Sequence, residues 1–152
     1  MILSGGIIGG NLKTIQTKNA QDLILFGETF AKENLKIGDK ILVTGVMGSG
    51  KTTLAQGISN GLGLNVNITS PTFSKLNIYQ DKLSFYHFDL YNLQTEEELE
   101  ELGIYDFMES EDGVSYIEWW DNFPNFFNTP YHLIEIQITN EGRLVSFDTI
   151  ST

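Results

Sequence analysis

The pattern of apolar and polar positions divides this chain into short strands and three helices. Apolar residues that alternate with polar ones, or form short runs, predict strands, and apolar residues three and four positions apart predict helices. The predicted strands are residues 12–17, 40–44, 73–79, 83–89, 114–118, 131–139 and 143–148. The predicted helices are residues 19–35, 51–62 and 95–102. Helices interleave with strands early and antiparallel pairs come late, so we predict an α/β fold with a mixed sheet flanked by helices.

Capping residues mark the ends of two of these helices. Asn19 has the side chain that a helix N-cap needs, directly before the first helix. Thr95 and Glu98 have the spacing of a capping box at the start of the third helix, and Gly103 follows its last apolar residue. The acidic run in that first turn is therefore read as a solvated helix start.

One stretch carries a specific chemical signal. Residues 45–53 read Gly-Val-Met-Gly-Ser-Gly-Lys-Thr-Thr and fit the phosphate-binding P-loop at Gly45, Gly50, Lys51 and Thr52. Glycines let the backbone curl around an anion, and the following helix directs its positive end at the same place. In such a loop the lysine reaches the β- and γ-phosphates and the threonine hydroxyl holds Mg²⁺. The strand before it and the helix after it complete the required setting, so we expect a P-loop NTPase-like sheet that is parallel at this loop.

Length and composition bound the remaining possibilities. The chain has 152 residues, 41% of them hydrophobic, which predicts a single folded domain over residues 11–152. Residues 1–10 are apolar but glycine-broken and lack a basic flank, so we expect a tail rather than a signal peptide. The absence of cysteine excludes disulfides and thiol catalysis and is compatible with a cytoplasmic location.

The charge is strongly acidic. A net charge of −11 disfavours direct binding to nucleic acid and to anionic membranes, and no apolar run is long enough to span a bilayer. A phosphate ligand must therefore be held locally, by the loop and its metal ion.

Two acidic residues at predicted strand ends are the best partners for the P-loop. Asp89 ends the strand 83–89, and Glu118 ends an apolar strand in the manner of a Walker B acid. Either could hold Mg²⁺ through water or orient the attacking water, because Mg²⁺ prefers oxygen ligands. His87 lies two residues before Asp89 on the same strand face, where a structural role with a hydrogen bond to a site carboxylate is favoured over metal binding.

Arginine is scarce. Arg143 is the only one in the chain, whereas phosphoryl-transfer enzymes commonly clamp the migrating phosphate with arginine. Slow intrinsic hydrolysis that is helped by a partner fits this composition better than a free-standing kinase.

Four motifs together resemble one family, TsaE (also called YjeE). They are the P-loop 45–53, Ser70-Pro-Thr-Phe73, His87-Phe-Asp-Leu-Tyr91 with Leu93, and Ile117-Glu-Trp119. Their order and spacing match the family over about residues 20–150, although no later motif is specific alone. The resemblance implies a cytoplasmic ATPase that acts in forming threonylcarbamoyladenosine at position 37 of tRNA. It implies ATP or ADP and Mg²⁺ as ligands and a TsaB–TsaD-type protein complex as the partner, which ATP hydrolysis resets. The tRNA is then contacted only through that partner.

The resemblance also assigns roles to residues. It implies that Thr52 and Glu118 hold the metal, that Asp89 lies beside it, and that Lys51, Asp89 and Glu118 are catalytic. The implied nucleotide contacts are Gly45, Met47, Gly48, Ser49, Gly50, Lys51, Thr52, Thr53 and Arg143. The implied switch or partner residues are Ser70, Pro71, Thr72, Phe73 and Trp119. Adenine contacts are expected near residues 17–20 and at Arg143.

Two positions depart from the family pattern, and three rival functions remain open. The family usually has aspartate where this chain has Val46, and arginine where it has Asn92. A small P-loop kinase for a hydroxyl substrate would use an arginine-bearing lid, and a GTP-dependent switch would carry an Asn-Lys-x-Asp motif, which is absent. A nucleotide-binding adaptor without turnover is the third alternative.

Overall fold

The structure, a computed structural model, describes residues 12–70, 75–127 and 131–149 and has a mixed α/β architecture. In chain order its elements are β1 (Lys13–Thr17), α1 (Ala20–Asn34), β2 (Lys40–Thr44), α2 (Lys51–Gly61), β3 (Leu76–Gln80), β4 (Ser84–Asp89), α3 (Glu96–Leu102), α4 (Ile104–Met108), β5 (Gly113–Glu118), a 3₁₀ turn η2 (Trp120–Asn122), β6 (His132–Thr139) and β7 (Gly142–Asp148). The predicted fold class is confirmed, and every predicted element is present with ends shifted by a few residues. The short helix α4 is an addition, and the first two residues of the predicted strand 73–79 lie outside the described residues.

The seven strands form one sheet in the order β1-β7-β6-β2-β5-β4-β3. The four central strands β6, β2, β5 and β4 are parallel to one another, while β1, β7 and β3 are added antiparallel. Parallel strands end at the same edge of a sheet, and catalytic groups in such folds gather outside their carboxyl ends. The register places Asp89, the last residue of β4, beside Glu118, the last residue of β5. Glu118 in turn lies beside Val43 of β2, one residue before that strand ends.

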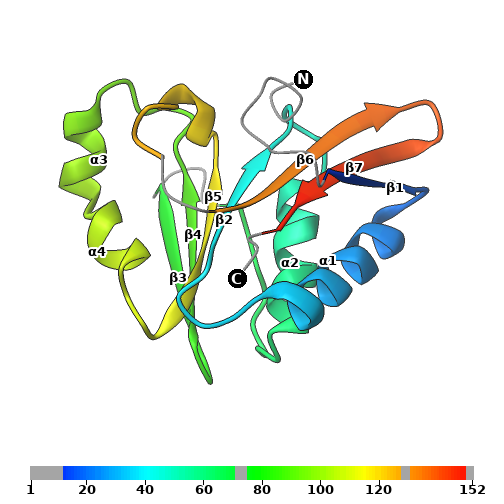
Figure 1. Ribbon diagram of the computed structural model, residues 1–152, viewed down its shortest axis with the longest axis horizontal. Coiled ribbons are helices and arrows are strands. Elements are labelled where there is room, and N and C mark those ends of the chain that lie inside the picture. Colours follow the sequence, from blue (N-terminus) through cyan, green and yellow to red (C-terminus); the bar gives the residue numbers. More distant parts are fainter. Residues whose placement is uncertain (1–11, 71–74, 128–130, 150–152) are drawn as a thin grey trace.

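Helices cover both faces of the sheet. Figure 1 shows α1 and α2 on one side and α3 and α4 on the other. Leu54 and Ile58 of α2 pack into one apolar core, and Leu99 and Ile104 from the other pair of helices pack into the second. Central parallel strands are apolar on both faces because both faces are covered. No helix among the described residues is long and apolar enough to cross a membrane.

The predicted caps hold the helix ends in place. The Asn19 side chain accepts a hydrogen bond from the Asp22 amide at 2.9 Å. Thr95 and Glu98 form the complete capping box at α3. Gly103 adopts the left-handed conformation with φ 77° and serves both as the end of α3 and as the start of α4.

Candidate nucleotide-binding site

The P-loop joins β2 to α2 with glycines where the backbone requires them. Gly48 and Gly50 have φ of 79° and 114°, values that residues with a Cβ rarely adopt. A Cβ on Gly50 would also lie 2.6 Å from Cδ2 of Leu23 on α1. The helix α2 then begins at Lys51, so its free backbone amides and its positive end face the loop. The predicted strand–loop–helix setting is confirmed.

Lys51 is folded against the loop that precedes it. Its side chain is 7% exposed, and its ammonium donates a hydrogen bond to the Gly45 carbonyl. The Nζ atom lies 4.0 Å from Oε1 of Glu118 and 4.0 Å from the centroid of the Trp119 ring. Burial lowers the pKa of Lys51, and the nearby carboxylates of Glu118 and Asp89 oppose that shift. A buried ammonium with few fixed partners is suited to an incoming anion.

The two predicted acids lie side by side at the ends of β4 and β5. Glu118 is buried, whereas Asp89 is half-buried and accepts a hydrogen bond from the Tyr91 amide at 3.0 Å. Burial raises the pKa of Asp89, the Tyr91 amide acts in the opposite direction, and the adjacent Glu118 raises it further. Asp89 and Glu118, at the ends of their strands, thus form a compact charged group with Lys51 of the P-loop.

A buried chain of contacts fixes Glu118. Nε2 of His87 lies 2.5 Å from Oε2 of Glu118, and the His87 side chain is fully buried. The His87 ring packs edge-on against Tyr116 at 5.1 Å, and the Tyr116 hydroxyl donates to the Lys51 carbonyl at 2.6 Å. The predicted structural role of His87 and its bond to a site carboxylate are confirmed, with Glu118 as the carboxylate. Tyr116 has no signal in the sequence, because an aromatic residue inside a strand reads as ordinary core.

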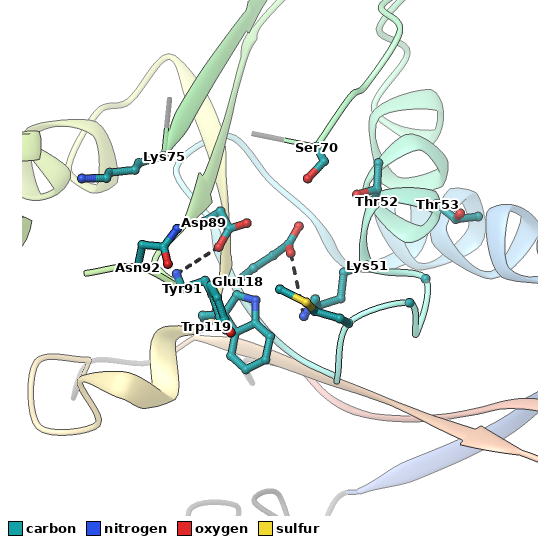
Figure 2. Close-up of a pocket in the computed structure, with 13 residues that line it drawn as sticks. Lys51, Thr52, Thr53, Ser70, Lys75, Asp89, Tyr91, Asn92, Glu118 and Trp119 are labelled. Carbon is teal, nitrogen blue, oxygen red and sulfur yellow. Dashed lines mark hydrogen bonds and ion pairs between the residues drawn. The ribbon is translucent and has the colours of Figure 1, made fainter. Parts of the chain in front are cut away.

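These groups open into a hollow of about 470 Å³. Of the predicted site residues, it is lined by Met47, Gly48, Gly50, Lys51, Thr52, Thr53, Ser70, Asp89, Glu118 and Trp119. Figure 2 shows Thr52 and Ser70 across the hollow from Asp89, with the Glu118 carboxylate directed at Lys51. Lys75 also lines it and had no signal in the sequence, whereas Tyr91 closes the motif 87–91 noted there. Asn92, which stands where the family usually has arginine, lines the hollow as well. Pro71, Thr72 and Phe73 lie outside the described residues.

The remaining predicted loop residues act from behind the hollow. Ser49 is fully buried, and Gly45 supplies the carbonyl that holds Lys51. A Cβ on Gly45 would lie 2.4 Å from Oγ of Ser49 and 3.1 Å from the Ile136 carbonyl oxygen, so a larger residue there would have to displace the buried Ser49 side chain.

Arg143 lies in a second hollow, of about 340 Å³, on the other side of the P-loop. Its guanidinium donates to the Ser49 carbonyl at 2.8 Å and to the Gly48 carbonyl at 3.2 Å. Lys18, Asn19 and Ala20 line the same hollow, so the structure brings together Arg143 and three of the four residues expected near adenine. Thr17 does not line it, but its hydroxyl donates to the Arg143 carbonyl at 3.0 Å. Arg143 therefore supports the loop through its carbonyls, from a hollow that the two carboxylates do not line.

The two adjacent tryptophans separate into one core residue, Trp120, and one residue that lines the hollow, Trp119. Trp120 is buried and donates from Nε1 to Oγ1 of Thr44 at 3.0 Å. Trp119 has a left-handed backbone with φ 59°, and its ring lies over Lys51 and 4.9 Å from the Tyr91 ring.

The donors in the hollow fit Mg²⁺ bound together with phosphates. Mg²⁺ in nucleotide sites uses one or two carboxylates, a hydroxyl, water and phosphate oxygens rather than a complete protein cage. The hollow offers the Thr52 hydroxyl opposite the carboxylates of Glu118 and Asp89. Accordingly, no cluster of three or more metal-binding His, Asp or Glu side chains occurs in the described ranges.

Comparisons with known proteins agree with this geometry. A family model described as "Threonylcarbamoyl adenosine biosynthesis protein TsaE" matches residues 17–145. Relatives named tRNA threonylcarbamoyladenosine biosynthesis protein TsaE include one from Rickettsia prowazekii, 38% identical over 86% of this chain and 87% of the relative. Another, from Haemophilus influenzae, is 34% identical over 80% of this chain and 79% of the relative.

Other matches are shorter or more distant. The relative from Synechocystis is 40% identical over 65% of this chain, and the match spans 64% of that relative. A crystal structure of YdiB from Bacillus subtilis superimposes with a TM-score of 0.77 at 24% identity, covering 93% of this chain and 87% of that one, and supports the fold. The resemblance stated from the motifs is confirmed, and the chain belongs to the TsaE family.

Proposed function

We propose that this chain binds ATP and Mg²⁺ and hydrolyses ATP slowly, as an accessory protein in forming N6-threonylcarbamoyladenosine at tRNA position 37. The observation that carries the proposal is the convergence of Lys51, Asp89 and Glu118 on the hollow in front of the P-loop. The names of the relatives supply the pathway. In this proposal residues 11–152 act as one cytoplasmic domain.

Each charged group has a distinct task in the proposed reaction. Lys51 leaves the Gly45 carbonyl and binds the β- and γ-phosphate oxygens, for which its buried ammonium is already placed. Glu118, held by His87, and the Thr52 hydroxyl hold Mg²⁺, which supplies positive charge to the phosphates when bound. Asp89 orients the attacking water, and its raised pKa makes it a better proton acceptor than an exposed aspartate.

The proposal includes a protein partner, a TsaB–TsaD-type complex. The only arginine of the chain is engaged with the carbonyls of Gly48 and Ser49, so it is not directed at a migrating phosphate. This arrangement supports slow hydrolysis that the partner accelerates, and it disfavours a self-sufficient kinase. The net charge of −11 supports contact with tRNA only through the partner.

The test is phosphate release from ATP by the purified chain, alone and with the TsaB–TsaD-type pair. We expect weak release alone and a clear rise with the pair. Brisk release without the pair, or none in any mixture, would contradict the proposal. A phosphorylated metabolite in place of free phosphate would indicate the kinase alternative.

A further inference from the structure

Lys75 is the second basic residue of the nucleotide hollow and has no task in the function proposed above. It directly precedes β3, is half-buried, and lines the hollow together with Lys51. No other lysine or arginine of the described residues lines this hollow. Without Lys75, the lining has the positive charge of Lys51 against the negative charges of Asp89 and Glu118. A γ-phosphate adds further negative charge, so a second cation would stabilise it there.

The backbone of Lys75 lies directly opposite Asp89. The β3–β4 register pairs Leu76 with Phe88, so the next pair along these antiparallel strands is Lys75 with Asp89. The Lys75 carbonyl accepts a hydrogen bond from the Asp89 amide at 2.8 Å, which extends the ladder to this pair. Opposite residues of antiparallel strands direct their side chains to the same face when both are extended. An extended Lys75 would therefore direct its ammonium at the hollow, beside Asp89.

The observed conformation of Lys75 is left-handed instead. Its φ is 64°, a value that is unfavourable for a residue with a Cβ. Figure 2 shows its side chain directed away from the Asp89 carboxylate. The hydrogen bond from the Gln94 amide and, to a smaller extent, the charge of Lys75 lower the pKa of Glu98, so the ammonium acts on the start of α3.

This resting position leaves the ammonium available to a ligand. Within the described ranges, no carboxylate lies within ion-pair distance of Lys75. An unfavourable backbone conformation beside a binding site is a common mark of a residue that moves or acts in function. Lys75 combines this conformation with a charge that has no ion pair, at the edge of the hollow that Asp89 and Glu118 line.

We propose that Lys75 is a second phosphate-binding residue of this site, which contacts the γ-phosphate of ATP and thereby distinguishes ATP from ADP. This inference rests on the proposed function. On ATP binding, Lys75 changes from the left-handed to the extended conformation and its ammonium turns into the hollow beside Asp89. ADP has no γ-phosphate and leaves Lys75 directed at α3. Lys51 contacts the phosphates of both nucleotides, so the preference for ATP depends on Lys75.

The experiment compares two nucleotides that differ by the γ-phosphate. Calorimetry with Mg²⁺ gives the Kd for ADP and for the non-hydrolysable β,γ-imido analogue of ATP. Lys75→Gln removes the charge, Lys75→Gly removes it in a residue that accepts a φ of 64°, and Lys75→Arg keeps it. Lys82→Gln is the matched control, because Lys82 is exposed in the link at the opposite end of the same strand pair. Circular dichroism and Tm verify folding, and phosphate release is measured with and without the TsaB–TsaD-type pair.

We expect Lys75→Gln and Lys75→Gly to raise the Kd for the analogue about tenfold, because a charge-assisted hydrogen bond to the γ-phosphate is lost. The Kd for ADP should change by less than about twofold, because Lys75 does not reach the remaining phosphates. Lys75→Arg should retain most of the preference for the analogue, and Lys82→Gln should leave both constants within about twofold of the wild type.

Four other outcomes overturn the inference. Unchanged affinity of Lys75→Gln for the analogue, with a wild type that binds and hydrolyses ATP, removes Lys75 from the site and leaves the proposed function standing. Equal losses for ADP and the analogue exclude a γ-phosphate contact. Unchanged affinities with release that falls only in the presence of the pair assign Lys75 to the partner. A wild type that binds neither nucleotide removes the proposed function as well.

Discussion

Two pairs of a buried histidine with a carboxylate lie at opposite ends of the parallel strands and differ in what surrounds them. His87 lies 2.5 Å from Glu118 near the carboxyl end of β4, and His132 lies 3.0 Å from Asp39 at the amino end of β6. Glu118 also lies 4.0 Å from the Lys51 ammonium, whereas in the described ranges Asp39 has no lysine or arginine within ion-pair distance. The two pairs thus have different surroundings, and we expect only the His87–Glu118 pair to act in the proposed reaction.

The largest difference in activity between changes at the two ends of the parallel strands should come from the lysines, Lys51 and Lys40. We expect Lys51→Ala to lower phosphate release at least about 100-fold, because it removes the cation that meets the phosphates. Lys40→Ala, at the opposite end of β2, should leave release within about twofold. Steady-state phosphate release measures both, and equal losses would show that the comparison reflects stability alone.

Changes to the two carboxylates, Glu118 and Asp39, should distinguish an effect on ATP hydrolysis from an effect on ADP binding. Glu118→Gln should lower Mg²⁺-dependent hydrolysis by about 10- to 100-fold and weaken ADP binding much less, because the amide no longer carries the charge that binds the metal. Asp39→Asn should change neither. Calorimetric ADP binding alongside release rates tests this pair, and hydrolysis retained in Glu118→Gln would remove Glu118 from the mechanism.

The histidines test whether the pair itself matters. His87→Asn should lower kcat by about tenfold with little change in KM, because the shorter amide does not reach Glu118 and no longer holds it in orientation. His132→Asn should lower Tm by a few degrees with kcat intact, since it loses the Asp39 bond and the edge-on contact with Phe30. Partial rescue by His87→Gln, whose amide nitrogen can take the place of Nε2, and none by His87→Ala would support a positioning role. Loss of kcat in both asparagine variants would contradict it.

The smallest expected effect concerns stability and pH. Burial raises the pKa of Asp89, so the folded chain binds its proton more tightly than the unfolded chain does. Stability therefore falls as pH rises from the ordinary aspartate pKa through the raised one. Asp89→Asn should remove this fall and raise Tm by about 2 °C at pH 7, while hydrolysis is lost. Tm measured from pH 4 to 8, with the exposed Asp106→Asn as control, checks the sign. A Tm that falls in Asp89→Asn would refute it.

Much of the site could be predicted because local sequence and sheet geometry agree. The glycine–lysine motif defines its own loop, and acids that end neighbouring parallel strands must meet at one edge, which brings Asp89 and Glu118 together. Hydrogen bonds from a strand side chain to the backbone of the P-loop or of α2 could not be predicted. Nothing in the sequence relates the Tyr116 hydroxyl to the Lys51 carbonyl, or Arg143 to the carbonyls of the P-loop.

The short helix α4 escapes prediction for a different reason. Gly103 is correctly predicted to end α3, but a left-handed glycine can also turn the chain directly into a second helix. A glycine signals the end of the helix whether a loop or a second helix follows. The packing of Ile104 and Met108 in the core favours the second helix here.

The backbone of Trp119 has a consequence for which residues this position can accept. A bulky residue with φ of 59° costs the fold about 1 kcal/mol or more, and glycine would relieve that cost. Glycine would also remove the ring that packs against Tyr91, Lys51 and the second apolar core. The position therefore combines an unfavourable backbone conformation with a ring placed beside the P-loop lysine, and the contacts of that ring offset the backbone cost.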